Sequence, residues 1–296
     1  MYSQDQEKYY FDQAKQFLAS DAPENEASYE LLKKIIKYAD WKYYAQSNPL
    51  LADVEYDILF KQLIRFEQVH PQCIKNDSPT QRVAMGLSER FPSVAHLVPM
   101  LSLENTYNEQ DILDWDKKCR ESLQADAITY CIEPKYDGAS ISLVYQNDLL
   151  DRGITRGDGV KGEEITNNVK QIRSIPLSAA FTEKGIEQIE IRGEVVIHKA
   201  IFDAYNQQRS EEGLAPLANP RNAASGTLRM LDAQEVAKRK LTAIAYHVSN
   251  ITAAPTADLP NTHYDMVRFL AQEGFPTPIQ EMRVCHTIEE VIATCN

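Results

Sequence analysis

Residues 128–156 read ITYCIEPKYDGASISLVYQNDLLDRGITR, and this stretch decides the fold. Its apolar runs predict three short strands, and the polar triplet QND predicts a hairpin between the second and the third. Further β-rich runs follow at 188–197 and 241–248. Helical patterns at 109–124 and 199–210 do not alternate strictly with these strands. The mixture favours an α+β domain with antiparallel sheets over a doubly wound parallel fold.

The first part of the chain has a different pattern of apolar and polar residues, which predicts helices. Residues 26–40, EASYELLKKIIKYAD, carry apolar side chains at helical spacing. The lysines of this segment, which we expect on the outer face, are Lys33, Lys34 and Lys37. A second helix is expected from about Asp53 to His70, with Asp53 as its N-cap and Pro71 as the stop signal. The early segment therefore predicts a small helical unit.

Length and composition support a large soluble protein with two parts. The 296 residues are 43% hydrophobic, which allows a substantial core. We expect a helical unit over residues 1–72 and a larger domain over residues 73–296. The net charge of −12 argues against binding nucleic acid by bulk electrostatics, so any such contact has to be local. The best local candidate is the segment 221–240, in which five cations face two acids.

Several classes of protein are disfavoured by what the sequence lacks. No apolar run approaches the roughly 20 residues of a membrane span, and the start does not resemble a signal peptide, so we expect a cytoplasmic protein. The five cysteines contain no Cys-x-x-Cys pair, and the six histidines form no metal-binding motif. The sequence therefore supports neither a disulfide framework nor a zinc site.

The most informative motif is Glu133-Pro134-Lys135-Tyr136-Asp137-Gly138, between the first and second expected strands. If its backbone is extended, Glu133, Lys135 and Asp137 project to the same side. One interpretation is a surface ion pair at a turn. The other is a lysine nucleophile, which has to lose its proton before it attacks. Because flanking carboxylates favour the protonated form of a lysine, this chemistry would need a metal ion to offset them.

Three further motifs follow downstream. TRGDGVKGE at 155–163 has three glycines, which permit a tight loop close to a ligand. IRGE at 191–194 ends a β-rich run, where its acid could accept hydrogen bonds from a ribose. NPRNAASGTLR at 219–229 places two arginines among small residues, which suits either close packing or phosphate contact. Each motif alone is a weak signal.

The order and spacing of these motifs closely resemble the adenylation domain of the NAD-dependent DNA ligases. The resemblance extends upstream through DSPTQRV at 77–83, PMLSL at 99–103, YY at 43–44 and DVEYD at 53–57. It covers almost the whole chain, and several motifs coincide in the right order. The resemblance implies a nucleotidyltransferase-type domain with an ATP-grasp-like ligase fold, preceded by a helical unit that binds nicotinamide mononucleotide (NMN).

The resemblance also implies an activity and its participants. In that family a lysine attacks NAD, releases NMN and holds AMP, which then passes to the 5′-phosphate at a DNA nick. The adjacent 3′-hydroxyl finally seals the strand. We therefore expect NAD and magnesium as cofactors, nicked double-stranded DNA as partner and a monomeric protein.

The roles implied for individual residues follow from the matching motifs. Lys135 would be the nucleophile and Asp137 its catalytic neighbour. The adenosine part of NAD would be contacted by Ser102, Leu103, Glu133, Arg156 and Glu194. The NMN part would be contacted by Tyr43, Tyr44, Asp53, Val54, Glu55, Tyr56 and Asp57. The nick phosphates would be contacted by Arg221 and Arg229.

The spacing of the NMN motif supports this assignment. Asp53, Tyr56 and Asp57 fall at helical positions i, i+3 and i+4, so they share one face. Acids suit the surroundings of the cationic ring and the ribose hydroxyls, and a tyrosine ring can stack on nicotinamide. Such tyrosines can also be simple packing residues.

The resemblance breaks at the end of the chain, at Asn296. Family members continue with two further lysine motifs, an oligonucleotide-binding domain and a four-cysteine zinc module, whereas here no lysine follows Lys240. We therefore expect either a ligase fragment or a truncated relative, and slow adenylation by this chain alone. Two alternatives stay open. One is another lysine-adenylating nucleotidyltransferase, which the YY and DVEYD motifs argue against. The other is a non-catalytic NAD- or DNA-binding relative.

Overall fold

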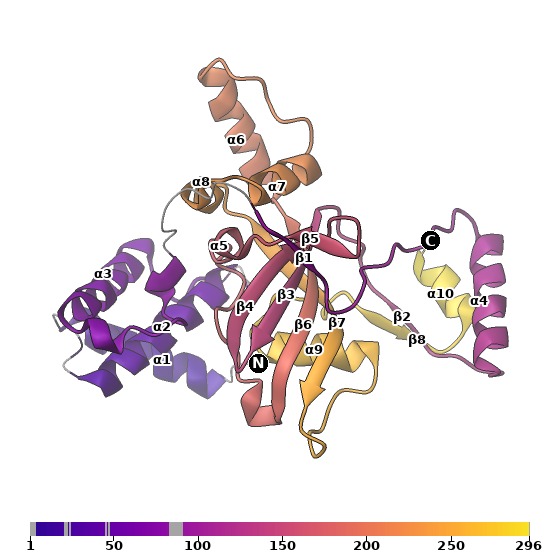
Figure 1. The fold of residues 1–296 in the computed structure, drawn as a ribbon, viewed down its shortest axis with the longest axis horizontal. Helices are drawn as coiled ribbons and strands as arrows, with labels where there is room; N and C mark the ends of the chain where they lie inside the picture. Colours follow the sequence, from indigo (N-terminus) through magenta and orange to yellow (C-terminus); the bar gives the residue numbers. More distant parts are fainter. Residues whose placement is uncertain are drawn as a thin grey trace.

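The structure is a computed structural model, and Figure 1 shows its three parts. A helical unit comes first, a central sheet with its covering helices follows, and a small layer of two strands and two helices lies on the far side of the sheet. The residues that the structure describes are 4–20, 23, 25–44, 46, 48–82 and 91–295, without the side chains of Gln4 and Tyr44.

The helical unit consists of α1 (Gln4–Leu18), α2 (Glu26–Tyr44) and α3 (Asp53–Val69), followed by the short 3-10 turns η1 (Pro71–Cys73) and η2 (Pro79–Arg82). Sequence periodicity predicted α2 and α3 but not α1. Apolar side chains from all three helices form one buried cluster, whose members include Ala14, Leu32, Ile36, Leu59 and Leu63. The unit therefore has a core of its own.

The predicted start of α3 needs a correction. The N-cap is Ala52, not Asp53, and no side chain caps the free N–H groups there. Instead, the Glu55 carboxylate accepts a hydrogen bond from the Ala52 backbone N–H at 3.1 Å. Asp53 is the first residue of the helix, where its negative charge favours the positive end of the helix dipole.

The prediction that Lys33 lies on the outer face is wrong. Lys33 is only 1% exposed, and its ammonium lies 2.9 Å from the Asp77 carboxylate and 3.3 Å from the Glu30 carboxylate. Lys37 is partly covered as well and contacts the second Asp77 oxygen at 2.6 Å. Periodicity marked these lysines as solvent-facing because it cannot show that residues after α3 fold back over them.

The central sheet is antiparallel, with the strand order β4–β3–β6–β7. The strands are β3 (Ala139–Gln146), β4 (Leu149–Thr155), β6 (Ile186–Val196) and β7 (Thr242–Ala253). The predicted hairpin between β3 and β4 is confirmed: Asn147 and Asp148 both have positive φ, at 47° and 72°. Two such residues in succession match a type I′ turn, which suits the twist of paired strands.

One face of the sheet is apolar and the other is polar. Ile141, Leu143, Ile189 and Ile191 belong to the main buried cluster. The helices that contribute to this cluster or pack beside it are α5 (Thr166–Val169), α7 (Pro220–Leu228), α8 (Ala233–Lys238) and α9 (His263–Gln272). Helix α6 (Lys199–Glu211) projects away from this body in Figure 1. The short turn η3 (Thr182–Lys184) precedes β6.

The polar face is crossed by the segment that follows residue 91. Strand β1 (Ser93–Ala95) pairs with β5 (Lys161–Glu163), and the Arg192 guanidinium of β6 donates to the carbonyls of Val98 and Pro99 at 2.7 and 3.0 Å. These contacts hold residues 96–101 against the sheet.

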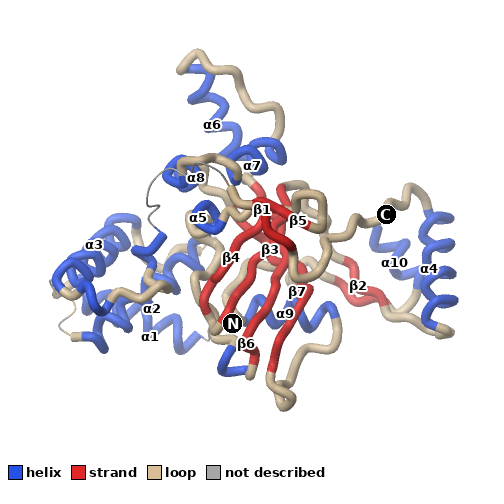
Figure 2. Tube along the Cα trace, in the orientation of Figure 1, coloured by secondary structure: helices blue, strands red, loops and turns tan. Residues whose placement is uncertain are grey.

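The small outer layer, drawn in Figure 2, pairs β2 (Tyr130–Ile132) with β8 (Arg283–Cys285). Helices α4 (Glu109–Leu123) and α10 (Ile288–Cys295) cover it, and Tyr130, Cys285, Ile288 and Val291 form its core. Mixed helices and antiparallel sheets confirm the predicted α+β class. Within the described residues, no helix is both long and apolar enough to cross a bilayer.

Candidate active site

Lys135 lies on an extended segment that joins β2 to β3, and its neighbours are anchored to other elements. The Glu133 carboxylate lies 3.0 Å from the ring Nε2 of His263, at the start of α9. The Tyr136 hydroxyl donates to Glu281 at 2.7 Å. These two contacts hold the segment on either side of Lys135.

The Lys135 side chain itself is exposed, and no described residue forms a hydrogen bond or ion pair with it. Its two neighbouring acids bind elsewhere: Asp137 pairs with Arg221 of α7 at 2.9 Å. The ammonium is therefore not locked between the carboxylates, and it is accessible to a ligand.

Gly138, the last residue of the KYDG motif, sits where a side chain cannot fit. A Cβ at this position would lie 2.2 Å from the Val195 carbonyl oxygen. Its backbone N–H donates to Glu194 Oε1 at 3.1 Å, and the Ser140 hydroxyl donates to Oε2 of the same carboxylate at 2.7 Å. Glu194, predicted as a ribose contact, therefore also ties the motif to β6.

Two of the predicted adenosine contacts are brought together by the glycine-containing loop. The Arg156 guanidinium donates to the Ser102 hydroxyl at 2.8 Å. The loop reaches residue 100 because Gly159 has a φ of 92° and its carbonyl accepts the Met100 N–H at 2.7 Å. Leu103 follows with its side chain open to solvent, at 75% exposure. The arrangement suits a ligand that would cover this leucine.

Sequence reasoning missed Tyr246. In β7, His247 is paired with Arg192 and Ala245 with Gly193, so Tyr246 is the extra residue of a β-bulge. Burial, followed by the nearby Glu194 charge, raises the pKa of the Tyr246 hydroxyl, and Ser140 is its hydrogen-bond partner. Bulges often redirect side chains next to active sites. A strand pattern alone cannot locate the bulge, because it depends on the partner strand.

A cavity of about 320 Å³ lies beside the beginning of α3. It gathers most of the predicted NMN contacts: its polar and aromatic lining is Asp40, Tyr43, Asp53, Tyr56, Asp57 and Arg173. Asp40 and Arg173 were not predicted. The Tyr56 hydroxyl donates to Asp40 at 2.9 Å. Four of the predicted residues thus line one pocket: Tyr43 lies near the end of α2, and Asp53, Tyr56 and Asp57 lie in the first turns of α3.

The remaining predicted NMN residues do not line this cavity. Val54 is 70% exposed, and Glu55 pairs with Lys15 of α1 while it also accepts the Ala52 N–H. The side chain of Tyr44 lies outside the described residues. Only the part of the DVEYD motif at helical spacing faces the pocket.

A second cavity, of about 490 Å³, lies between the glycine-containing loop and α7. Its lining carries one acid, Glu163, against the cations Arg156, Lys161, Arg221 and Arg229. Arg229 lies 2.6 Å from the Glu163 carboxylate. An excess of guanidinium and ammonium groups suits phosphate oxygens.

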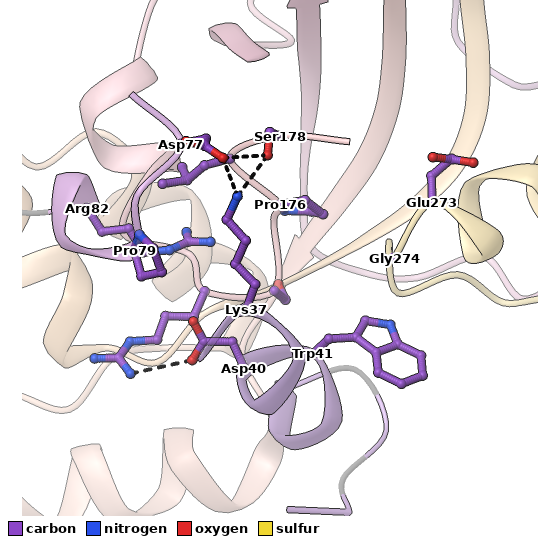
Figure 3. A pocket seen from close by; sticks show the side chains of 13 residues that line it. Lys37, Asp40, Trp41, Asp77, Pro79, Arg82, Pro176, Ser178, Glu273 and Gly274 are labelled. Atoms are coloured by element: carbon purple, nitrogen blue, oxygen red, sulfur yellow. Dashed lines mark hydrogen bonds and ion pairs between the residues drawn. The ribbon is translucent and has the colours of Figure 1, made fainter. Parts of the chain in front are cut away.

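The helical unit is joined to the sheet domain by a polar contact, which Figure 3 shows from close by. Lys37 reaches both Asp77 and the Ser178 hydroxyl, at 2.6 and 3.0 Å. The Arg82 guanidinium donates to three backbone carbonyls of the sheet domain, those of Lys170, Ile172 and Ile175. These bonds fix the unit against the segment 170–178.

The 320 Å³ cavity and Lys135 lie apart in this arrangement. In Figure 1 the helical unit stands beside β4, whereas the segment with Lys135 enters β3 from the side of β2 and β8. Among the described residues, no group of three or more His, Cys, Asp or Glu is arranged to hold a metal ion.

Comparison with known families matches both parts of the chain. Residues 88–296 match the NAD-dependent DNA ligase adenylation domain. Residues 22–84 match the DNA ligase-like, N-terminal NAD+-binding domain. The second match contains every residue of the helical unit that lines the 320 Å³ cavity.

Individual relatives that resemble the chain carry the name of the same family. The chain is 50% identical over 274 residues to a protein named DNA ligase from Persephonella marina, which covers 91% of the chain and 38% of the relative. It is 50% identical over 266 residues to the DNA ligase of Aquifex aeolicus, covering 90% and 37%. For the DNA ligase of Sulfurihydrogenibium azorense, 46% identity extends over 100% of the chain and 43% of the relative. The chain thus spans about two fifths of the length of these relatives.

Proposed function

Because this chain belongs to the family of NAD-dependent DNA ligases, we propose that it takes AMP from NAD for later use in strand sealing. Lys135 is the proposed nucleophile. The observation that carries the proposal is the contrast between Lys135 and its neighbours. Glu133, Tyr136 and Asp137 are each held by another element, whereas the Lys135 ammonium is exposed and unpaired within the described structure. A rigid segment that presents one accessible amine suits nucleophilic attack.

In the proposed first step, the neutral Lys135 Nζ attacks the α-phosphorus of the AMP moiety of NAD. A P–N bond forms, the bridging P–O bond breaks, and NMN leaves with the bridging oxygen. The proton lost from Nζ passes to solvent. The product is a phosphoramidate of Lys135 with AMP.

Arg221 assists this step by its position. Two carboxylates beside an amine favour its charged form, which is not nucleophilic. The contact of Arg221 with Asp137 offsets one of these charges. Magnesium, when bound to the NAD phosphates, would neutralise negative charge there and favour loss of the lysine proton. Asp137 could supply one carboxylate to it, which fits the preference of magnesium for few protein ligands plus phosphate and water.

Two later steps involve DNA. We propose that AMP passes to the 5′-phosphate of a nick in double-stranded DNA and that the 3′-hydroxyl then displaces AMP to seal the strand. The 490 Å³ cavity with Arg221 and Arg229 is the candidate contact for the nick phosphates. We further propose that the protein acts as a monomer.

Mass spectrometry tests the first step. Incubating the chain with NAD and magnesium should add the mass of one adenylyl group, and Lys135→Ala should abolish the adduct. ATP in place of NAD should give no adduct, because a triphosphate does not use the cavity at Asp53, Tyr56 and Asp57. NAD binding without any adduct, both in this chain and in a sealing-competent protein that contains it, would favour the alternative of a non-catalytic NAD-binding relative.

A further inference from the structure

A fully buried carboxylate lies on the polar face of the central sheet, against the segment that follows β1. Glu190 of β6 is 0% exposed, and the hydroxyl groups of Ser142 and Ser249 donate to its two carboxylate oxygens at 2.5 and 2.8 Å. The backbone N–H of Val98 donates to the same carboxylate at 3.3 Å. Hydrogen bonds of this kind offset the cost of burying a charge. Glu190 therefore anchors the segment at Val98.

The side chain of His96 lies beside this carboxylate and is also fully buried. Its Nδ1 lies 3.9 Å from Glu190 Oε1, and among the described residues it has no hydrogen-bond partner. Its Nε2 lies 3.1 Å from the backbone carbonyl oxygen of Arg156. A carbonyl can only accept a hydrogen bond, so Nε2 is the donor. The ring thus joins the anchored segment to the backbone of Arg156.

His96 holds the glycine-containing loop at both ends of residues 156–160. Its ring donates to the carbonyl of Arg156, and its backbone N–H donates to the carbonyl of Val160 at 3.1 Å. Between these two points, the Gly159 carbonyl accepts the Met100 N–H. The loop is therefore tied to the segment at three places. The place at Arg156 depends on the His96 side chain.

The guanidinium of Arg156, in contrast, lies near the surface. It donates to the hydroxyl of Ser102, which is exposed and therefore accessible to a ligand. An arginine side chain loses conformational freedom when it binds, and a backbone that is already fixed reduces the total loss. A bond to the carbonyl of Arg156 thus favours one arrangement of its guanidinium.

We propose that His96 is a positioning residue for the adenosine part of NAD. Its ring holds the backbone of Arg156, so that the guanidinium stays beside Ser102 and can donate to a ribose hydroxyl. The inference rests on the proposed function, in which the adenosine part of NAD lies against these two residues. His96 does not contact the ligand itself, because its side chain is fully covered.

Other roles of a histidine suit this position less well. A general acid or base has to reach the reacting group, which the buried ring of His96 does not. A metal site needs further ligands, and the described part of the chain holds no suitable group of three or more His, Cys, Asp or Glu. For packing alone, an apolar ring would serve without a buried carboxylate beside it.

Two substitutions separate the two nitrogens of the ring. The amide nitrogen of a glutamine can take the place of Nε2, whereas that of an asparagine can take the place of Nδ1. His96→Gln should therefore keep the donor to the Arg156 carbonyl, and His96→Asn should lose it. Calorimetric titration with AMP, which contains the adenosine part, should show roughly tenfold weaker binding for His96→Asn. For His96→Gln the loss should be less than about threefold.

NMN and a remote histidine provide the controls. NMN lacks adenosine, and His96 does not line the 320 Å³ cavity proposed for it, so the thermal shift produced by NMN should be the same in all variants. A general disturbance of the fold would reduce this shift as well. His198→Asn makes the same change at an exposed histidine before α6 and should leave the affinity for AMP unchanged.

Nuclear magnetic resonance gives a second measurement, which needs no substitution at His96. In the unchanged chain, the ring ¹⁵N signals of His96 should show a proton on Nε2. AMP should shift these signals, because a ligand at the Arg156 guanidinium changes the surroundings of the carbonyl that Nε2 contacts. NMN should leave them in place.

The outcomes separate the inference from the function on which it rests. If His96→Asn binds AMP as tightly as the unchanged chain, or if His96→Gln loses as much affinity as His96→Asn, the inference is overturned. A reduced NMN shift in His96→Asn would also overturn it, because His96 would then support the fold in general. The same holds if Nε2 carries no proton, or if AMP binds without moving the ring signals. If the unchanged chain neither binds AMP nor forms the Lys135 adduct with NAD, the proposed function itself fails.

Discussion

The Arg221 guanidinium lies 2.9 Å from the carboxylate of Asp137, two residues after Lys135. Asn219 caps α7 by accepting the Asn222 N–H at 2.7 Å, so Arg221 stands in the first turn of a capped helix. Both partners are largely exposed, and an exposed ion pair contributes only about 0–1 kcal/mol to stability. Its significance therefore lies in placing a positive charge beside the lysine segment.

The two arginines of α7 should differ in their effects. Arg221→Ala should slow formation of the Lys135-AMP adduct by about tenfold or more, because Asp137 would lose its counter-charge. Arg229→Ala should spare the adduct, since Arg229 pairs with Glu163, away from the lysine segment. Rates of adenylyl mass gain with NAD and magnesium measure both effects. Equal slowing in the two variants would contradict the distinction.

Sealing of a nick should respond to Arg229. In a sealing-competent protein that contains this chain, Arg229→Ala should weaken sealing of nicked DNA while adduct formation continues, because the cavity at Arg229 is rich in cations suited to phosphate. Gel assays of a labelled nick would measure this. Phosphate contacts weaken as the salt concentration rises. If Arg229→Ala seals nicks as well as the unchanged protein even at raised salt, Arg229 does not contact the DNA.

Gly138 should be intolerant of any side chain. Gly138→Ala would push a Cβ against the Val195 carbonyl and disturb the N–H bond to Glu194, so we expect a loss of about 2–4 kcal/mol in stability. Gly226→Ala is the matched control, because nothing lies within 4 Å of its Cβ position in α7. That variant should keep or slightly raise stability. Urea unfolding of both variants gives the comparison, and equal midpoints would contradict the close packing at Gly138.

The NMN cavity should depend on Asp57. Asp57→Ala should reduce the thermal shift that NMN produces, because a carboxylate lining the cavity is lost. Asp12→Ala removes an exposed carboxylate from α1, outside the cavity, and should keep the full shift. An unchanged shift in Asp57→Ala would argue that NMN binds elsewhere.

Low pH should weaken the contact between the helical unit and the sheet domain at Asp77. Although burial opposes it, the ammonium groups of Lys37 and Lys33 lower the pKa of Asp77 to about 2, below its ordinary 3.8. A lowered folded-state pKa gives stability that is present above pH 3.8 and is lost as the pH falls towards 2. The shift corresponds to about 2 kcal/mol at neutral pH.

Asp77→Asn tests this contribution. It should lower the urea midpoint at pH 7, since two partly buried ammonium groups would lose their carboxylate. Burial already lowers the pKa of Lys37, which shows the cost of covering that charge. Between pH 4 and pH 3 the midpoint of Asp77→Asn should fall less than that of the unchanged chain. A parallel fall would contradict the role of Asp77.

Periodicity and turn chemistry were enough to predict α2 and α3 of the helical unit, the β3–β4 hairpin and the α+β class, but not α1. These features depend on neighbours a few residues apart, and hydrophobic spacing reports them directly. The start of α3 was misplaced by one residue, because a glutamate side chain replaced the expected cap. The inner position of Lys33 was missed, because its partner Asp77 lies 44 residues away.

The sequence by itself determined which residues could carry the chemistry: a lysine in KYDG, acids and tyrosines at helical spacing, and arginines among small residues. Only the tertiary structure decided their partners. Asp137 meets Arg221 across 84 residues, Tyr246 is the extra residue of a β-bulge, and Arg173 lines a cavity together with residues of the helical unit. The reason is physical: spacing along the chain sets the face of a helix or strand, whereas the element that covers that face is chosen by packing and by charges distant in sequence.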